Sequence, residues 1–276
     1  MARNGRIVLL IVLIGVLIAA IFVMRQRIFS KPETAQLKVS AAVLSDPRQC
    51  QITVTVDRPK NDVDISVTVT AKPGIRFADT GQRNASRDVG RVFPLEERVL
   101  TFDCYLDGTI LHSGTYIVKA EANHLSPGAV EGKQYATGNT KLYVELRPDN
   151  TNSFLASEDT FDELFTGPYV EGAYYQYSLG LQPEENKPSG GLLHVRINSG
   201  KDDFSPALDV VVSGGVAFLS PSFNGFIWHV DDALVRLQAK GIDKGGSRIV
   251  TVPFSMIPAA MPGSYAVSYT HLTLPT

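Results

Sequence analysis

Along most of the chain, apolar and polar positions alternate with the period of a β-strand. Ile52, Val54 and Val56 are separated by threonines, as expected for a strand with one buried face. Similar runs in the first half predict strands at residues 36–44, 50–56, 63–70, 98–105, 115–122 and 140–146. Turn sequences rich in Pro, Gly, Asp and Asn separate these runs. Short strands at this spacing predict a β-sandwich over residues 32–147.

The second half repeats the β pattern. It predicts strands at residues 173–181, 192–198, 208–213, 235–239 and 247–254. Residues 182–191 are polar and contain Pro and Gly, so we expect a long connection between the first two of these strands. A second β-sandwich is therefore predicted at residues 169–266, and the fold class should be mainly β.

Between the two sandwiches, residues 148–168 are predicted to form a hinge and a short helix. RPDNTNS at residues 147–153 has the composition of a solvated linker. Ser157 is a candidate helix N-cap, acidic residues follow it, Phe161 begins an apolar face, and Gly167-Pro168 ends the segment. Asp and Asn oxygens in the hinge could hold calcium, but their spacing does not match a calcium loop, which favours a linker.

The amino-terminal residues depart from this pattern with an uncharged run of eighteen residues from Ile7 to Met24. As a helix this run is about 27 Å long, close to the hydrocarbon thickness of a bilayer. It is longer than the apolar stretch of a cleaved signal peptide and leads directly into Arg25, so we predict an uncleaved transmembrane anchor within residues 1–31. A buried soluble helix is the alternative, but the β-rich remainder offers no helices to cover it.

Positive charges flank this run on both sides, so they decide its orientation only weakly. Two cysteines in a β-rich domain suit an oxidising compartment, and Asn84-Ala85-Ser86 would accept an N-linked glycan in a suitable host. We therefore expect a single-pass cell-membrane protein with the lipid bilayer around Ile7 to Met24 and its bulk extracytoplasmic, either periplasmic or on the cell surface. A cytoplasm-facing scaffold is the alternative.

Composition leaves little chemistry to assign. The net charge of −2 lacks the basic surplus expected of a nucleic-acid-binding protein. The sequence has no C-x-x-C pair, no histidines at metal-ligand spacing and no phosphate-binding glycine loop. Asp202-Asp203 and Asp231-Asp232 are candidate acid pairs for glycoside hydrolysis, but both lie beside turns where solvated charges are expected. We predict no cofactor, no metal and no catalytic residue.

The two cysteines are a candidate disulfide. Cys50 opens one predicted strand and Cys104 closes another, so antiparallel pairing of these strands would place them opposite each other. A disulfide closing a loop of about 54 residues would stabilise the domain by roughly 4 kcal/mol in the chain-entropy model. Two buried free thiols are the alternative.

Residues 220–229 (SPSFNGFIWH) bring Phe223, Phe226 and the only tryptophan, Trp228, into one Pro- and Gly-containing stretch. Exposed aromatic side chains on loops can stack on sugars or insert into a protein partner, so these three are candidate ligand-binding residues. The favoured alternative is that Trp228 fills the core of the second sandwich.

Two segments resemble known domains. SGTYIVKA, residues 113–120, resembles the penultimate strand of many immunoglobulin-like domains, where a tyrosine, here Tyr116, ties down the preceding corner. LQAKGIDKGGSRIVTVPF, residues 237–254, followed by a Pro-Gly corner, resembles the carboxy-terminal half of two module families. These are the cell-adhesion-related domain of bacteria and the immunoglobulin-like module attached to galactosidases. The resemblance implies tandem immunoglobulin-like surface modules of a bacterial or archaeal type.

The last ten residues, VSYTHLTLPT at 267–276, resemble the translation of a transposon-based sequencing adapter. The resemblance implies that native sequence stops near Ala266, that the second sandwich is incomplete and that His271 belongs to no site. A real terminal strand is the alternative, because Val267 and Tyr269 alternate with polar residues.

These features predict a membrane-anchored extracytoplasmic protein, not an enzyme, whose tandem modules serve as a spacer, adhesion or envelope-assembly element. Its expected partner is an envelope protein or a polysaccharide. The alternative is an amino-terminal accessory region of an exported carbohydrate-active or other enzyme, with the catalytic domain missing from this fragment.

Overall fold

The computed structural model describes residues 35–57, 59, 62–109, 112–125, 133–146, 151–165, 169–172, 174–184, 187–219, 227–257 and 267–272. The chain divides into two compact units, Met1–Ala35 and Gln36–Thr276. The run from Ile7 to Met24 lies outside the described residues, so the anchor stays a prediction. Among the helices that are described, none has the length and apolar character needed to cross a bilayer.

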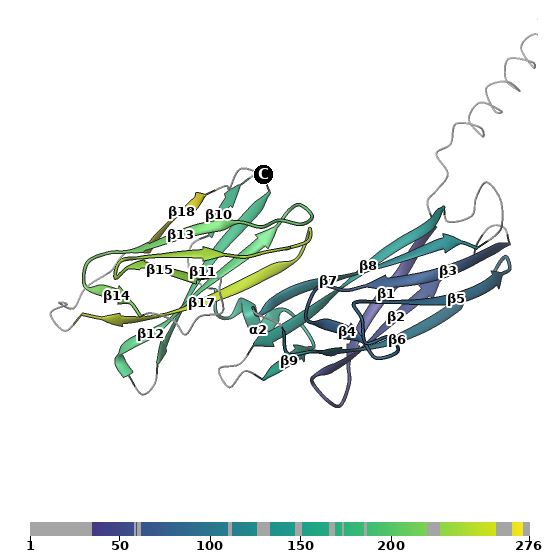
Figure 1. Ribbon diagram of the computed structural model, residues 1–276, viewed down its shortest axis with the longest axis horizontal. Helices are drawn as coiled ribbons and strands as arrows, with labels where there is room; N and C mark the ends of the chain where they lie inside the picture. Colours follow the sequence, from purple (N-terminus) through teal and green to yellow (C-terminus); the bar gives the residue numbers. More distant parts are fainter. Residues whose placement is uncertain are drawn as a thin grey trace, which may run out of the picture. The chain divides into compact units, whose positions relative to one another are not determined.

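The first module, residues 35–155, is a β-sandwich. Its described strands are β1 (Ala35–Val43), β2 (Gln49–Val56), β3 (Val63–Thr70), β4 (Ile75–Phe77), β5 (Asn84–Val92), β6 (Arg98–Leu106), β7 (Gly114–His124), β8 (Gln134–Leu146) and β9 (Asn152–Leu155). They follow the order β4-β6-β2-β1-β8-β7-β3-β5, with β9 paired to β8. The β1–β8 contact therefore joins two layers around one core (Figure 1).

The apolar residues of the alternating pattern form the inner faces of these layers. Ile52, Val54 and Val56 are fully buried on β2, while the residues between them are partly exposed. Val67 on β3 and Phe102 on β6 face the same core. Burying one such side chain contributes about 1.5–3 kcal/mol, so this alternation largely determines which face of each strand points inward.

The second module, residues 169–272, is also built from two sheets. Its described strands are β10 (Tyr169–Gly172), β11 (Tyr175–Glu184), β12 (Lys187–Ser199), β13 (Ala207–Val212), β14 (Val216–Phe218), β15 (Ile227–Asp231), β16 (Leu234–Gln238), β17 (Ser247–Met256) and β18 (Val267–Leu272). One sheet has the order β10-β11-β12-β17-β14 and the other β15-β16-β13-β18. Val195 and Val250 from the first sheet pack in one core with Val210 and Leu237 from the second.

The mainly β fold class is confirmed, and each predicted strand overlaps a strand of the structure. The structure differs at two predicted connections. Residues 182–191 continue β11 and β12 as far as the Glu184–Lys187 pair, because an antiparallel partner satisfies backbone groups whatever the side chains are. The predicted hinge enters β9, where Asn152 and Phe154 are buried against the first module.

The predicted helix after the hinge is present but short. It is α2 (Asp159–Asp162), and its N-cap is Glu158, which makes no side-chain capping bond. Ser157, the predicted cap, instead donates its hydroxyl to Asp159 Oδ2 (3.0 Å). Phe161 is buried as the apolar pattern predicted. A helix of one turn gains little from capping, so its position depends on what it packs against.

The suspected adapter segment contains β18, which pairs with β13 from Val212 opposite Val267 to Ala207 opposite Leu272. An edge strand offers unpaired backbone groups to any neighbouring segment that can extend, so this pairing does not depend on the origin of residues 267–276. Their origin from an adapter therefore stays a prediction.

Candidate functional site

The two modules touch where the start of β7 meets β17, a contact we name the junction. The Ile249 amide donates to Ser113 O (2.8 Å), and the Thr115 amide donates to Ser247 Oγ (3.1 Å). Gly114 lies between the two first-module residues with φ of +143°, and a Cβ at this position would collide with Ser247 O. Glycine therefore allows the two backbones to approach this closely.

Arg248 is the buried cation of the junction, with 5% of its surface exposed. Its guanidinium carbon lies 3.7 Å from the centroid of the Tyr116 ring, and its Nη1 donates to Thr115 O (3.1 Å). Burial lowers the pKa of Arg248 and raises that of Tyr116. The contact is thus a desolvated cation–π pair, which is the stronger form of this interaction.

Tyr116 also confirms the predicted tyrosine corner. Its hydroxyl donates to His112 O (2.7 Å), four residues upstream. The ring is thereby fixed by its own module on one side and covered by Arg248 of the second module on the other. The corner residue of the first module therefore serves as a docking surface for the second.

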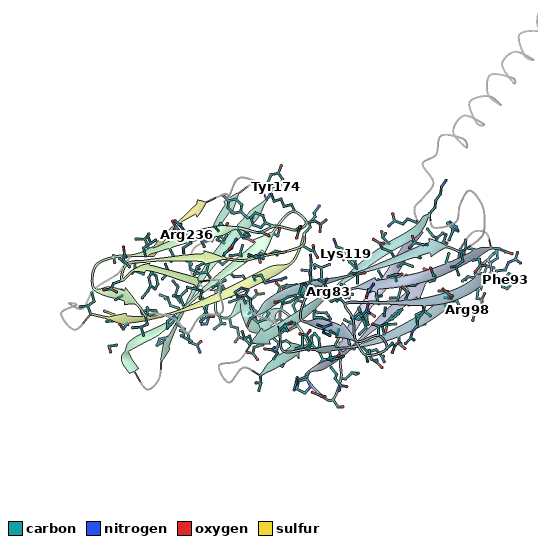
Figure 2. All side chains as sticks on the ribbon, viewed as in Figure 1. Arg83, Phe93, Arg98, Lys119, Tyr174 and Arg236 are labelled. Carbon is teal, nitrogen blue, oxygen red and sulfur yellow. The ribbon has the colours of Figure 1, made fainter. Side chains whose placement is uncertain are left out.

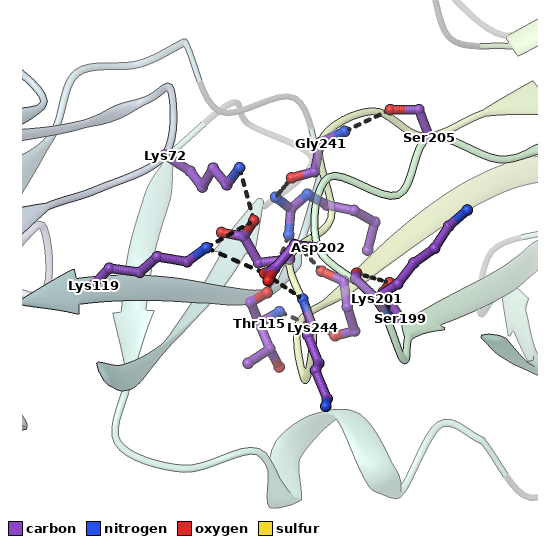
Figure 3. A network of polar contacts seen from close by, with 12 residues as sticks. Lys72, Thr115, Lys119, Ser199, Lys201, Asp202, Ser205, Gly241 and Lys244 are labelled. Atoms are coloured by element: carbon purple, nitrogen blue, oxygen red, sulfur yellow. Dashed lines mark hydrogen bonds and ion pairs between the residues drawn. The ribbon is translucent and has the colours of Figure 1, made fainter. Parts of the chain in front are cut away.

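A carboxylate of the second module holds two lysines of the first. Asp243, which is 5% exposed, pairs with Lys72 (Nζ–Oδ1 3.0 Å) and Lys119 (Nζ–Oδ1 3.8 Å). Lys119 also donates to Asp202 Oδ1 (3.2 Å), as Figure 3 shows. Burial opposes the charge of Lys119, but its hydrogen bond to Asp202 and the charge of Asp243 raise its pKa overall. The same hydrogen bond lowers the pKa of Asp202, so the charged forms stabilise each other.

The α2 segment, which lies between the two modules in the chain, supplies further ion pairs to the second module. Arg196 on β12, 8% exposed, pairs with Glu158 and Asp162. Glu158 Oε1 also accepts from Thr115 Oγ1 (3.3 Å), which links this set to the β7 contact. Gly180 on β11 permits the close packing, because a Cβ there would collide with the Leu164 carbonyl.

A cleft of about 580 Å³ opens beside the junction. Lys72, Arg76, Arg83 and Lys119 line it together with Asp243, and Figure 2 labels Arg83 and Lys119 on this side of the first module. Three of the four cations are already engaged in ion pairs with carboxylates. The cleft therefore belongs to the charge network of the junction, with little positive charge left for a ligand.

Asn84, the candidate glycan acceptor, is exposed at the start of β5 and also lines this cleft. Its carbonyl accepts a hydrogen bond from Thr80 Oγ1 (2.8 Å). Ser86 Oγ, the sequon hydroxyl, is hydrogen-bonded with Thr68 Oγ1 (2.8 Å). The side chain is accessible, and its glycosylation stays a prediction.

The cysteines meet as the strand pattern predicted. β2 and β6 pair antiparallel with Cys50 directly opposite Cys104, and both are buried free thiols. Cys104 Sγ donates to Cys50 O (3.2 Å). The side-chain hydrogen bond with Cys50 and burial raise the pKa of Cys104, so this thiol is a poor nucleophile. The disulfide itself stays a prediction.

Of the candidate aromatic residues, Phe223 and Phe226 lie outside the described residues, and only the backbone of Trp228 is described. Trp228 stands opposite Arg236 in the β15–β16 register, whereas Ile227 is buried. Both the ligand-binding role of the aromatic residues and the core position of Trp228 therefore stay predictions.

Two of the candidate acids take part in structural contacts. Asp202 belongs to the junction, and Asp231 Oδ1 accepts from the Ala233 amide (2.8 Å) within a turn. Within the described ranges, no group of three or more His, Cys, Asp or Glu side chains is placed to hold a metal ion. The hinge residues Asp149 and Asn150, considered for calcium, lie outside those ranges.

Sequence reasoning missed the buried charges that hold the modules together. Arg248 and Asp243 lie in the segment noted for its glycine turn, and Glu158 was expected only as a first-turn acid. A charged residue beside a turn is usually solvated, so its type alone does not reveal burial. The available signal was Gly114, two residues before the corner tyrosine, because a glycine within a strand often marks a close backbone approach.

No family model and no curated protein matches the chain. Red sea bream transglutaminase is similar to it at 12% identity and a TM-score of 0.25, over 86% of this chain and 29% of that chain. The partial N-terminal region of the enterococcal surface protein is similar at 6% identity and a TM-score of 0.27, over 80% of this chain and 83% of that chain. The type II cohesin dyad from the adaptor ScaA scaffoldin of Acetivibrio cellulolyticus is similar at 8% identity and a TM-score of 0.26, over 85% of this chain and 88% of that chain. The chain spans 29% of the transglutaminase. At these TM-scores the similarities say nothing of function, and the β-sandwich assignment rests on sheet topology.

Proposed function

We propose that the protein is a membrane-anchored, extracytoplasmic spacer that holds two β-sandwich modules as a rigid pair. The apolar run from Ile7 to Met24 motivates the anchor. The observation that carries the spacer role is the junction, where Arg248 and Asp243 of the second module are buried and contact Tyr116 and Lys72 of the first. Such a pair would keep the second module at a fixed position relative to the first, as adhesion or envelope assembly requires.

Relative motion is the default for neighbouring domains joined by a polar segment. Here any rotation about the junction would separate Arg248 from the Tyr116 ring and Asp243 from Lys72. A rotation that kept one of these charges buried without its partner would be strongly unfavourable, because the charge would then have neither a partner nor water. Several such contacts acting together support one fixed arrangement.

The location is tested with the full chain in bacterial cells. We expect the protein to resist extraction by alkaline carbonate and to be cut by protease added outside spheroplasts. Protection from that protease until the membrane is broken would place the modules in the cytoplasm and refute this part of the proposal.

The rigidity is tested by pulsed electron paramagnetic resonance on spin labels at Thr101→Cys and Ala233→Cys, both at exposed positions. The native thiols are buried and should escape labelling. We expect one narrow distance distribution, which Arg248→Met combined with Asp243→Asn should broaden. Arg236→Met, which breaks an exposed pair with Asp209 inside the second module, is the matched control. A broad distribution in the parent chain would refute the spacer role.

A further inference from the structure

The turn between β5 and β6, together with the start of β6, exposes an unusual amount of apolar surface. Phe93, Leu95 and Val99, which we name the apolar tip, are 51%, 82% and 55% exposed. They are three of the eight large apolar side chains that are exposed in the described part of the chain, and they fall within seven residues. Clustered exposed apolar residues usually mark a surface that contacts a partner or a membrane.

The backbone of the tip holds Leu95 outward at a cost. The Glu96 amide donates to Phe93 O (3.1 Å), which closes a turn with Pro94 and Leu95 at its centre. Leu95 has φ of +69°, as the third residue of a type II turn requires, and glycine or asparagine is normally found there. An exposed leucine in a strained position favours neither folding nor solubility, which points to a role in binding.

The tip lies at the end of the first module where the chain enters it. Leu37 near the start of β1 pairs with Val56, and Val56 pairs with Arg98, which precedes Val99 of the tip. Figure 2 labels Phe93 and Arg98 together at this end. Only residues 25–34 separate β1 from the predicted membrane span, and ten residues reach at most about 35 Å.

We infer that the apolar tip rests on the lipid bilayer, inserting Phe93 and Leu95 past the headgroups into the outer part of the apolar layer. This inference rests on the proposed membrane anchoring. The nearby charges suit a bilayer without strong net charge, because Arg91 pairs with Asp62 and Arg98 with Glu96. The exposed Glu97 adds a carboxylate, so the tip has no positive surplus to attract anionic lipids. Arg91 also covers the Phe93 ring at 5.5 Å from its centroid, an arrangement that keeps the cation at headgroup level while the ring enters the apolar layer.

The full chain in phosphatidylcholine vesicles tests this contact. In a Trp228→Phe background, Phe93→Trp places a single fluorophore at the tip, and lipids brominated on their acyl chains quench any tryptophan that reaches them. We expect brominated vesicles to reduce this fluorescence at least twofold. Leu181→Trp, at a 61% exposed position on β11 of the second module, is the matched control and should show no such quenching.

A second variant separates lipid contact from folding. Leu95→Asn keeps a residue that tolerates positive φ but removes the apolar side chain. Added to the Phe93→Trp chain, it should reduce the quenching at least twofold while leaving the unfolding midpoint unchanged or higher. Unquenched tryptophan at position 93, or quenching unaffected by Leu95→Asn, would overturn the inference.

Carbonate extraction of the same vesicles distinguishes the two proposals. If the chain stays in the membrane and the tip is unquenched, the lipid contact fails and the anchor stands. If the chain is extracted, the anchoring fails and the inference fails with it. Energy transfer between dye-labelled copies that rises with protein density, together with an unquenched tip, would assign the tip to a second copy of the chain and also overturn the inference.

Discussion

Replacing Arg248 with methionine tests whether a buried cation holds the junction. Methionine keeps much of the side-chain volume but removes the charge, the contact with the Tyr116 ring and the hydrogen bond to Thr115 O. A desolvated cation–π contact is worth about 2 kcal/mol, and a hydrogen bond from a charged donor about 1.5–3 kcal/mol. Relief from burying the guanidinium offsets part of this loss. We therefore expect Arg248→Met to lower the free energy of unfolding by about 3 kcal/mol, near the low end of measured values for breaking buried charge pairs.

Denaturant unfolding of the detergent-solubilised full chain measures this change. Trp228 is the only tryptophan and lies in the second module, so its fluorescence reports on the module that Arg248 belongs to. A loss of about 3 kcal/mol corresponds to roughly 6–12 °C in the thermal midpoint of a chain of this size. Tyr116→Leu, alone and combined with Arg248→Met, isolates the ring contact, for which we expect a coupling of about 1–2 kcal/mol.

Arg236→Met provides the matched control. Arg236 makes a two-pronged pair with Asp209 inside the second module, and because the Arg236 side chain is exposed, its loss should lower the free energy of unfolding much less than the loss of Arg248. If Arg248→Met costs less than about 1 kcal/mol, or no more than the control does, the buried cation does not hold the junction and the reasoning from burial is refuted.

Four further outcomes follow from the geometry. Gly114→Ala should lower the free energy of unfolding by about 1–3 kcal/mol and broaden the distance distribution between the modules, because alanine is strained at this positive φ and its Cβ would collide with Ser247 O. Leu95→Gly should raise the free energy of unfolding by about 0.5–1 kcal/mol, because removing the strain of a positive φ outweighs the extra conformational entropy that glycine gives the unfolded chain. A lower free energy of unfolding would show that Leu95 is not strained. Oxidising the Cys50–Cys104 pair should raise the free energy of unfolding by roughly 4 kcal/mol relative to the reduced chain. An unchanged unfolding midpoint would show that no stabilising disulfide forms. Burial, with the charge of Arg248, lowers the pKa of His112 from 6.5 to about 4. The contribution of His112 to the free energy of unfolding should therefore be fully present above pH 6.5. It should fall by about 1.4 kcal/mol per pH unit as the pH drops toward 4, because the unfolded chain binds the proton more readily. His112→Gln should flatten this slope in pH-dependent denaturant unfolding.

The predicted strands came from side-chain alternation, and they succeed where that alternation faces a core. β2 shows this directly, because Ile52, Val54 and Val56 mark its buried face in the sequence itself. β5 (Asn84–Val92) was not predicted, since seven of its residues are only partly buried or exposed and its neighbour β3 supplies the pairing. A strand that forms mainly because a neighbouring strand offers backbone hydrogen bonds shows little alternation of apolar and polar residues in its own sequence.

The junction shows the opposite situation, in which residue types are visible but their partners are not. Lys72 and Asp243 are 171 positions apart in the sequence, and each is a residue type that is usually found on the protein surface. Their contact exists only once two separately folded modules meet. Local patterns can predict the tyrosine corner, because Tyr116 and His112 belong to one turn, but they cannot predict which distant surface covers that corner.

The buried charges of the junction favour one arrangement of the two modules more than they strengthen the attachment between them. A purely apolar contact would tolerate small shifts, because burial of apolar area depends little on direction. A shift of one residue between β7 and β17 would instead move Thr115 away from Ser247 and leave Arg248 without the Thr115 carbonyl and the Tyr116 ring. Buried charges are weak contributors to net stability but are costly when unpaired, so alternative arrangements are penalised far more than the observed one is rewarded. A spacer that must present its second module in one direction needs this kind of contact, since its task depends on excluding other orientations.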